Sequence, residues 1–307
     1  MTQTSVEKNY LTKVVAAPRN EYLSYLTIHS VKLLHLLNRK TIAIFFITVW
    51  LNSCITHREG MYLSPTNSLV YTYHTIPYKS DSLKSAFYAS MLFSVGSAND
   101  GGYDWIRAGG ASIYRSHNFG KCQAYYGANL TLGSYYMTDF YNSHYTAGGS
   151  PIDTFYHNPA KKYSFGSYGL SAGFNGVATK GRGEWRYLGV EATIQKEFGN
   201  YYTFRQSLPD SAANIIFRND LTGTIGIYSD ALWSYRNGSQ FGIKFGIYQV
   251  VNSQKEYTVQ NANIIFPVNF FSLTFHGTIK RFTGFMQSNI GTKASSFQIG
   301  TSYRLTR

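Results

Sequence analysis

Apolar and polar residues alternate along most of the chain from Ser85 onward. In the first such run, the odd positions from Phe87 to Val95 are mostly large and apolar, and the even positions from Tyr88 to Gly96 are smaller and more polar. Successive side chains of a β-strand point to opposite faces. The alternation therefore predicts strands with one apolar and one polar face.

The same pattern recurs in about ten segments, with eight or twelve as alternatives, and an even number is the rule for single-chain bacterial membrane barrels. We expect strands beginning at Ser85 and then at 104–116, 121–137, 162–175, 184–197, 220–233, 239–251, 269–279, 281–290 and 295–306. The pair Asn237-Gly238 predicts a two-residue hairpin turn. Long loops at 138–160, 198–219 and 252–267 follow the third, fifth and seventh strands, so all three should lie on one side.

The composition fits membrane strands. Aromatic residues make up 17% of the chain, with 27 Tyr and 21 Phe, and there are 28 Gly but only 7 Pro. Membrane barrels carry aromatic girdles and alternate apolar-out with polar-in residues. The last strand, with Phe297, Ile299 and Leu305 in alternation, resembles the amphipathic final strand of bacterial outer-membrane barrels. We expect residues 84–307 to form an all-β, antiparallel transmembrane β-barrel, similar in style to uncharacterised barrels of Bacteroidota.

A different pattern precedes the strands. Arg39-Lys40 is followed by an apolar run from Ile42 to Leu51 and then by Asn52-Ser53-Cys54. The run is too short to span a bilayer, which needs about 20 residues, but it suits a secretory signal. The end of this segment resembles a bacterial lipoprotein signal, which implies that Cys54 is lipidated.

That resemblance divides the N-terminal part of the chain. We expect a signal peptide at 1–53, with an N-terminal extension if translation starts at Val31, and a lipid-anchored periplasmic tether at 54–83. Some surface lipoproteins of Bacteroidota carry acidic residues just after the lipidated Cys. The sequence Ile55-Thr56-His57-Arg58 has none, so the expected anchor lies in the periplasmic leaflet of the outer membrane.

The charge is basic but scattered. The net formal charge is +13 for the chain and +9 from Cys54 onward. Because no long run of cations is present, we expect outer-membrane lipid, and not nucleic acid, as the partner. Cys122 is the other cysteine, so neither an internal disulfide nor a cysteine-based metal site is expected, and no cofactor is predicted.

Charges on strands are expensive on a lipid face, at about 2–4 kcal/mol for a cation at mid-depth. Arg107, Glu191 and Lys244 lie within predicted strands. We therefore expect these three residues to face the lumen or to lie near strand ends, and we take them as candidates for a lumen charge network that fills a closed barrel.

The long loop at 138–160 holds the remaining chemical candidates. His144, Asp153 and His157 are a weak metal or acid–base group, and Ser143-His144 with Asp139 invites comparison with barrel-type lipid hydrolases. Gly181-Arg182-Gly183 lacks the strand–turn–helix context of a nucleotide site.

These patterns predict a lipid-anchored, non-enzymatic outer-membrane barrel with a structural, transport-accessory or interaction role. Its long loops would recognise an envelope protein partner. The alternatives are a narrow channel, a lipid hydrolase and a lipid-tethered soluble β-domain.

Overall fold

The computed structural model describes residues 61–66, 73–77, 83–98, 104–142, 156–209, 212, 215–251, 254–257, 263–266, 269–291 and 294–306. All of them belong to the second of two compact units, His57–Arg307. The predicted signal peptide and Cys54 lie outside the described residues. No helix in the described part of the chain is long and apolar enough to cross a membrane.

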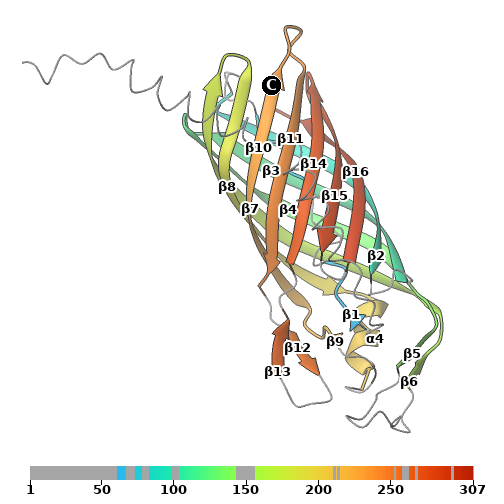
Figure 1. Ribbon diagram of the computed structural model, residues 1–307. Helices are drawn as coiled ribbons and strands as arrows, with labels where there is room; N and C mark the ends of the chain where they lie inside the picture. The colour runs from blue at the N-terminus through green and yellow to red at the C-terminus, as the bar shows by residue number, and fades with distance from the viewer. Residues whose placement is uncertain are drawn as a thin grey trace, which may run out of the picture. The chain divides into compact units, whose positions relative to one another are not determined.

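Ten strands form a closed antiparallel barrel, in the order β10-β11-β14-β15-β16-β2-β3-β4-β7-β8 (Figure 1). Their bounds are β2 Ser85–Ala98, β3 Asp104–Asn118, β4 Cys122–Met137, β7 Lys161–Lys180, β8 Gly183–Phe198, β10 Leu221–Ser234, β11 Gln240–Val250, β14 Asn269–Ile279, β15 Phe282–Gly291 and β16 Ala294–Arg304. Closure occurs where β16 pairs with β2, for example Ile299 with Phe93. The predicted ten-stranded antiparallel barrel is confirmed.

The barrel is apolar outside and polar inside. On β2, Met91 and Phe93 face outward and are exposed, whereas Ser90 and Ser94 face the lumen and are buried. All ten strands contribute large exposed apolar side chains to the outer surface: Met91, Phe93, Ile113, Tyr126, Leu132, Leu170, Phe174, Val190, Ile194, Ile225, Ile227, Ile247, Phe275, Met286, Phe297 and Ile299. This polarity is the reverse of that of a soluble protein and matches the membrane barrels, whose outer face contacts lipid.

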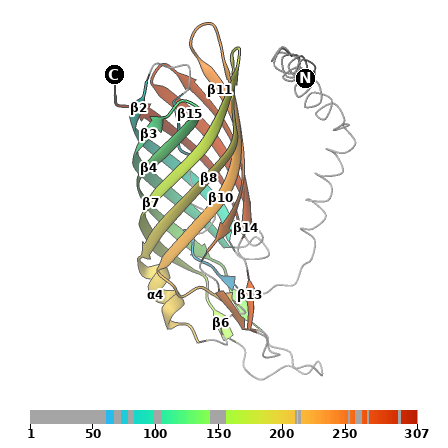
Figure 2. The same cartoon turned by 90° about the vertical axis from the view of Figure 1, so that its left-hand side faces the viewer.

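The two ends of the barrel differ (Figures 1 and 2). We call one the short-turn end, because its strands are joined by 119–121, 181–182, 235–239 and 280–281. We call the other the long-loop end. It carries helix α4 and three small sheets: β1 Met61–Tyr62 with β9 Ile215–Ile216, β5 Phe140–Asn142 with β6 Tyr156–Asn158, and β12 Gln254–Tyr257 with β13 Asn263–Phe266. The three long connections lie on one side, as predicted.

The hairpin at Asn237-Gly238 is present but longer than the predicted two-residue turn. The β10–β11 ladder ends at Ser234 opposite Gln240. Beyond it, the Tyr235 N–H donates to the Ser239 carbonyl at 2.8 Å. Gly238 has φ 79°, which a glycine adopts without strain.

Glycines and tyrosines pack together in the lumen. The Tyr228 ring covers Gly189 so closely that an added Cβ would lie 2.2 Å from its Cζ atom. The Tyr125 ring covers Gly173 in the same way, at 2.3 Å. A narrow barrel can hold large rings inside only where the neighbouring strand offers no side chain, because protein interiors are close-packed.

Candidate functional site

A short piece of chain occupies the lumen near the short-turn end. It consists of residues 73–77. The first four of these residues are 2–5% exposed, and Pro77 is also buried. The Thr75 N–H donates to the Tyr114 hydroxyl on β3 at 2.9 Å, and the Thr75 hydroxyl donates to Ser302 on β16 at 3.0 Å. We call residues 73–77 the lumen segment.

Aromatic stacking holds the first half of the lumen segment. The Tyr73 ring stacks on His276 of β14 with centroids 4.6 Å apart, and also contacts Phe285 of β15. The His74 ring stacks on Tyr125 of β4 at 4.8 Å. The lumen segment therefore contacts β4 as well as β14 and β15, which are not neighbours of β4 in the barrel.

Arg186 of β8 holds the second half. Its guanidinium is buried and donates to the carbonyl oxygens of Ile76 at 2.9 Å and Pro77 at 3.3 Å. The same group is paired with Glu184 at 3.1 Å and Asp230 at 2.8 Å. A guanidinium offers five donors in a fixed plane, so it can bind two carboxylates and two backbone carbonyls together.

A β-bulge at Tyr187 puts Arg186 in the lumen. On β7, Gly176 pairs with Leu188 and the next residue, Val177, pairs with Arg186, so Tyr187 is the extra residue. Simple alternation along this strand would place Arg186 on the same face as Leu188 and Val190, which is the outer face. The bulge reverses that placement, because an extra residue shifts every side chain before it to the opposite face.

Glu191 and Lys244 form a buried ion pair in the lumen. Lys244 Nζ donates to the two carboxylate oxygens of Glu191 at 2.7 and 2.9 Å. Tyr125 and Tyr248 also donate their hydroxyls to Glu191. The ammonium lies 4.0 Å from the Tyr228 ring centroid, which is a favourable cation–π position.

Arg107, the third predicted lumen charge, does not join them. It is exposed on the outer face of β3 near the long-loop end, and its guanidinium lies 4.4 Å over the Trp105 ring. Trp105 stacks on Tyr136, whose ring lies 5.0 Å from Lys162 Nζ. Arg107 is two residues from Trp105, so both side chains lie on the outer face of β3. Because Arg107 is near the end of the strand, its guanidinium can reach the membrane–water interface.

The chain just before the lumen segment lies at the long-loop end. Tyr62 accepts the Phe217 N–H through its carbonyl at 3.0 Å. Ser64 donates to Glu197 at the end of β8, and Thr66 donates to Thr222 at the start of β10 at 3.3 Å. At the other end, Lys84 accepts the Asn118 N–H at 2.9 Å as β2 begins.

Within the stretch 61–84, the described residues 61–66 lie at the long-loop end, 73–77 lie in the lumen, and 83–84 lie at the short-turn end. The sequence predicted a lipid-anchored tether at 54–83. Of its described pieces, 73–77 lies inside the barrel and 61–66 lies against the long-loop end. Tyr73 and Ile76 are apolar residues within a polar stretch, and this pattern could have indicated burial.

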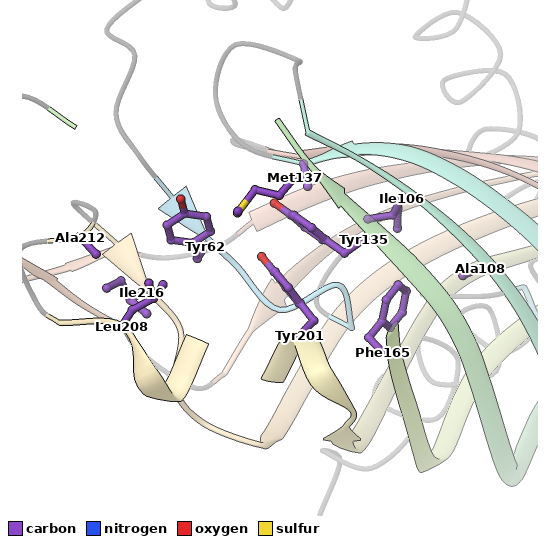
Figure 3. Packing of buried hydrophobic residues seen from close by; sticks show 11 residues of the cluster. Tyr62, Ile106, Ala108, Tyr135, Met137, Phe165, Tyr201, Leu208, Ala212 and Ile216 are labelled. Carbon is purple, nitrogen blue, oxygen red and sulfur yellow. The ribbon is translucent and has the colours of Figure 1, made fainter. Parts of the chain in front are cut away.

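An aromatic cluster closes the long-loop end (Figure 3). Tyr62 lies with Tyr135 of β4 and Tyr201 of α4, helix Asn200–Ser207, and the last two rings stack at 3.9 Å. Burial raises the pKa of Tyr201 well above its usual value, so its hydroxyl stays neutral. The Arg205 guanidinium of α4 lies 4.9 Å from the centroid of the Tyr201 ring and is paired with Glu197 at 2.6 Å, and both charged side chains are fully buried.

Comparison with known proteins gives no family. No family model matches the chain, and no curated protein matches it. Among solved structures, the chain is similar to the β-domain of the Bordetella autotransporter BrkA, with 10% identity over 72% of this chain and 100% of that chain and a TM-score of 0.36.

Two further autotransporter barrels are similar at the same level. The transport unit of AIDA-I from Escherichia coli shares 12% identity over 78% of this chain and 95% of its own, with a TM-score of 0.39. The translocator domain of NalP from Neisseria meningitidis shares 12% identity over 74% and 90%, with a TM-score of 0.35. The assignment of this chain as a closed membrane barrel rests on its own sheet topology and outward apolar surface.

The loop candidates are only in part described. His157 of β6 lies 3.6 Å from Asp139, and both side chains are largely exposed. Ser143, His144 and Asp153 lie outside the described residues. The described residues of this loop form a solvated pair and not a buried acid–base group.

Proposed function

We propose that this protein is a self-plugged outer-membrane β-barrel with a structural or interaction role. The observation that carries the proposal is the burial of residues 73–77 in the lumen, between residues 61–66 at the long-loop end and Lys84 at the short-turn end. The outward apolar surface of all ten strands supports membrane insertion, and it does not fit a lipid-tethered soluble domain.

Occupation of the lumen argues against the open-channel alternative. At the short-turn end, the lumen segment is bound by Arg186, Tyr114 and Ser302. Deeper in, the Glu191–Lys244 pair lies among tyrosines. Eight-stranded barrels are filled by their own side chains, and the ten strands here enclose the lumen segment as well. A lumen occupied in this way supports a rigid, closed barrel and not an open channel.

The position of Met61 at the long-loop end indicates which leaflet a lipid on Cys54 would enter. Bacterial outer-membrane barrels have short periplasmic turns and longer extracellular loops. By this rule the long-loop end faces outward, and Met61 lies there. Cys54 precedes Met61 by seven residues, which span at most about 25 Å. An acylated Cys54 would then enter the outer leaflet, the opposite of the periplasmic leaflet that the residues after Cys54 favoured.

Epitope tags test this proposal in whole cells. One tag is inserted after Arg58, a second after Gly148 in the long loop and a third after Asn237 in a short turn. We expect antibody to bind the first two on intact cells and the third only after permeabilisation. Binding of the Arg58 tag together with the Asn237 tag would overturn the threaded path, and inverted access of all three would overturn only the orientation.

Lipidation is tested separately. Metabolic labelling with an alkyne-tagged fatty acid should label the native protein and not the Cys54→Ala variant. If the native protein stays unlabelled, the lipid anchor is excluded, while the barrel and its threaded segment remain.

A further inference from the structure

Cations surround the short-turn end, at or beside every short turn and at both ends of the barrel chain. Seven of them are exposed, and two, Arg281 and Arg304, are partly buried; the exposed ones are Lys84, Arg115, Lys121, Lys180, Arg182, Arg236 and Lys280. We call this set the basic rim. Because the cations come from six places around the closed sheet, they form a ring and not a patch on one side.

Within the described residues, no exposed Asp or Glu lies at the short-turn end. The acids nearest the short-turn end are Glu184 and Asp230, and both are buried in the lumen and paired with Arg186. The long-loop end differs, because acids that are exposed or partly exposed accompany its exposed cations, Arg107, Lys161, Lys162 and Lys196. Asp139 is one of these acids, and Asp220 is paired with Lys196 at 3.4 Å. In the described part of the chain, the excess of exposed cations over exposed acids is therefore larger at the short-turn end.

Large apolar side chains lie at the same level as the basic rim. Phe119, Ile279 and Phe282 are 60–67% exposed beside or within the turns that carry the cations. Apolar groups next to Lys and Arg are typical of a membrane–water interface, where the stems lie along the apolar surface and the charges reach the headgroups. The rim is thus placed to meet lipid headgroups and not bulk solvent.

We propose that the basic rim binds anionic phospholipid headgroups in the leaflet at the short-turn end. Phosphodiester headgroups with a net negative charge are the complement of clustered Lys and Arg near a membrane surface. By the orientation given above, this is the periplasmic leaflet. The inference rests on membrane insertion of the barrel but goes beyond the proposed role, since neither the plug nor the long loops take part.

Built-in fluorophores allow a direct test. Trp185 and Trp233 lie on the outer face near the short-turn end and are 55% and 47% exposed, whereas Trp105 lies near the long-loop end. The full chain with Trp105→Phe and Trp50→Phe is reconstituted in phosphatidylcholine vesicles. Each vesicle preparation contains a small, equal fraction of brominated phosphatidylglycerol or brominated phosphatidylcholine, which quench nearby tryptophan.

We expect brominated phosphatidylglycerol to quench severalfold more than brominated phosphatidylcholine. The preference should fall to equality in 1 M salt, where the screening length is about 3 Å. It should also disappear when Lys121, Lys180, Arg236 and Lys280 are all replaced by Gln. The matched control, Lys161→Gln with Lys162→Gln at the long-loop end, should keep the full preference.

Equal quenching by both lipids in the native rim would overturn the proposal, as would a preference that survives the four substitutions. Quenching by brominated phosphatidylcholine reports membrane insertion by itself. A protein that neither lipid quenches would therefore refute membrane embedding, and a protein that both quench equally would refute only the rim.

Discussion

Lys244 on β11 donates to both carboxylate oxygens of Glu191 on β8, at 2.7 and 2.9 Å, across the interior of the barrel. β10 lies between these two strands in the sheet. The pair therefore ties together strands that are not neighbours. Tyr125 adds a third strand to the same carboxylate.

Removal of one partner of this pair should destabilise the barrel. Lys244→Met leaves the Glu191 charge buried without its cation, and we expect the free energy of unfolding to fall by about 3 kcal/mol. Lys244→Met combined with Glu191→Gln should lose less than the sum of the two single variants. Urea unfolding in lipid vesicles, followed by tryptophan fluorescence, measures all three.

The control for this prediction is the half-exposed pair of Lys196 and Asp220. Lys196→Met should cost less than about 1 kcal/mol, because exposed ion pairs contribute little. Strict additivity of the two lumen substitutions would show that the charges do not interact.

The lumen segment should be capable of covalent linkage to the barrel wall. The hydroxyl oxygens of Thr75 and Ser302 lie 3.0 Å apart. In a Cys122→Ser background, Thr75→Cys with Ser302→Cys should form a disulfide on oxidation. Non-reducing gels and mass spectrometry of the digested protein measure the link.

A second cysteine pair controls for chance collisions. Ser296 faces the same lumen from the same strand but lies six residues from Ser302, about 20 Å along the strand. Thr75→Cys with Ser296→Cys should not crosslink. Equal yields from the two pairs would mean that residue 75 has no defined place in the lumen.

Removal of the plug should increase ionic conductance. We expect the native protein to show no steady current in planar bilayers. Replacement of Tyr73 to Pro77 by five Gly and Ser residues removes the stacked rings of Tyr73 and His74 and the side chains of Ile76 and Pro77, and should give discrete current steps. Heat-modifiable mobility on a detergent gel checks that the variant still forms a barrel.

The same five-residue replacement at 235–239, an exposed turn, should leave the barrel closed. A native protein that conducts steadily would favour the channel alternative and count against a plugged lumen.

The packing of Tyr228 on Gly189 should be sensitive to a single methyl group. An added Cβ at Gly189 would lie 2.2 Å from the Tyr228 ring, and that ring is held by a hydrogen bond from Asn175 at 3.0 Å. Gly189→Ala should therefore destabilise the barrel by about 1–3 kcal/mol, as overpacking does. Gly284→Ala on β15 meets no atom within 4 Å and should change little. Equal urea midpoints for the two variants would contradict the close packing.

The sequence predicts the barrel well because strand alternation is a local property. On β2, the apolar Met91 and Phe93 alternate with the polar Ser90 and Ser94, and this alternation is enough to assign the lipid face and the lumen face of the strand. The same reasoning put Glu191 inside and allowed Arg107 to lie near a strand end. Alternation alone does not place Arg186 in the lumen, because the bulge at Tyr187 shifts the residues before it to the opposite face and leaves no mark in the alternation on either side.

By itself, then, the sequence determined the ten strands, their two faces and the side on which the long loops lie. These follow from a period of two and from turn residues, which act within a few positions. Only the tertiary structure decided that Lys244 meets Glu191, that Arg186 turns inward, and that residues 73–77 enter the lumen. Those contacts join residues 53 to 110 positions apart, and they depend on strand register and on closure of β16 against β2, which no local pattern encodes.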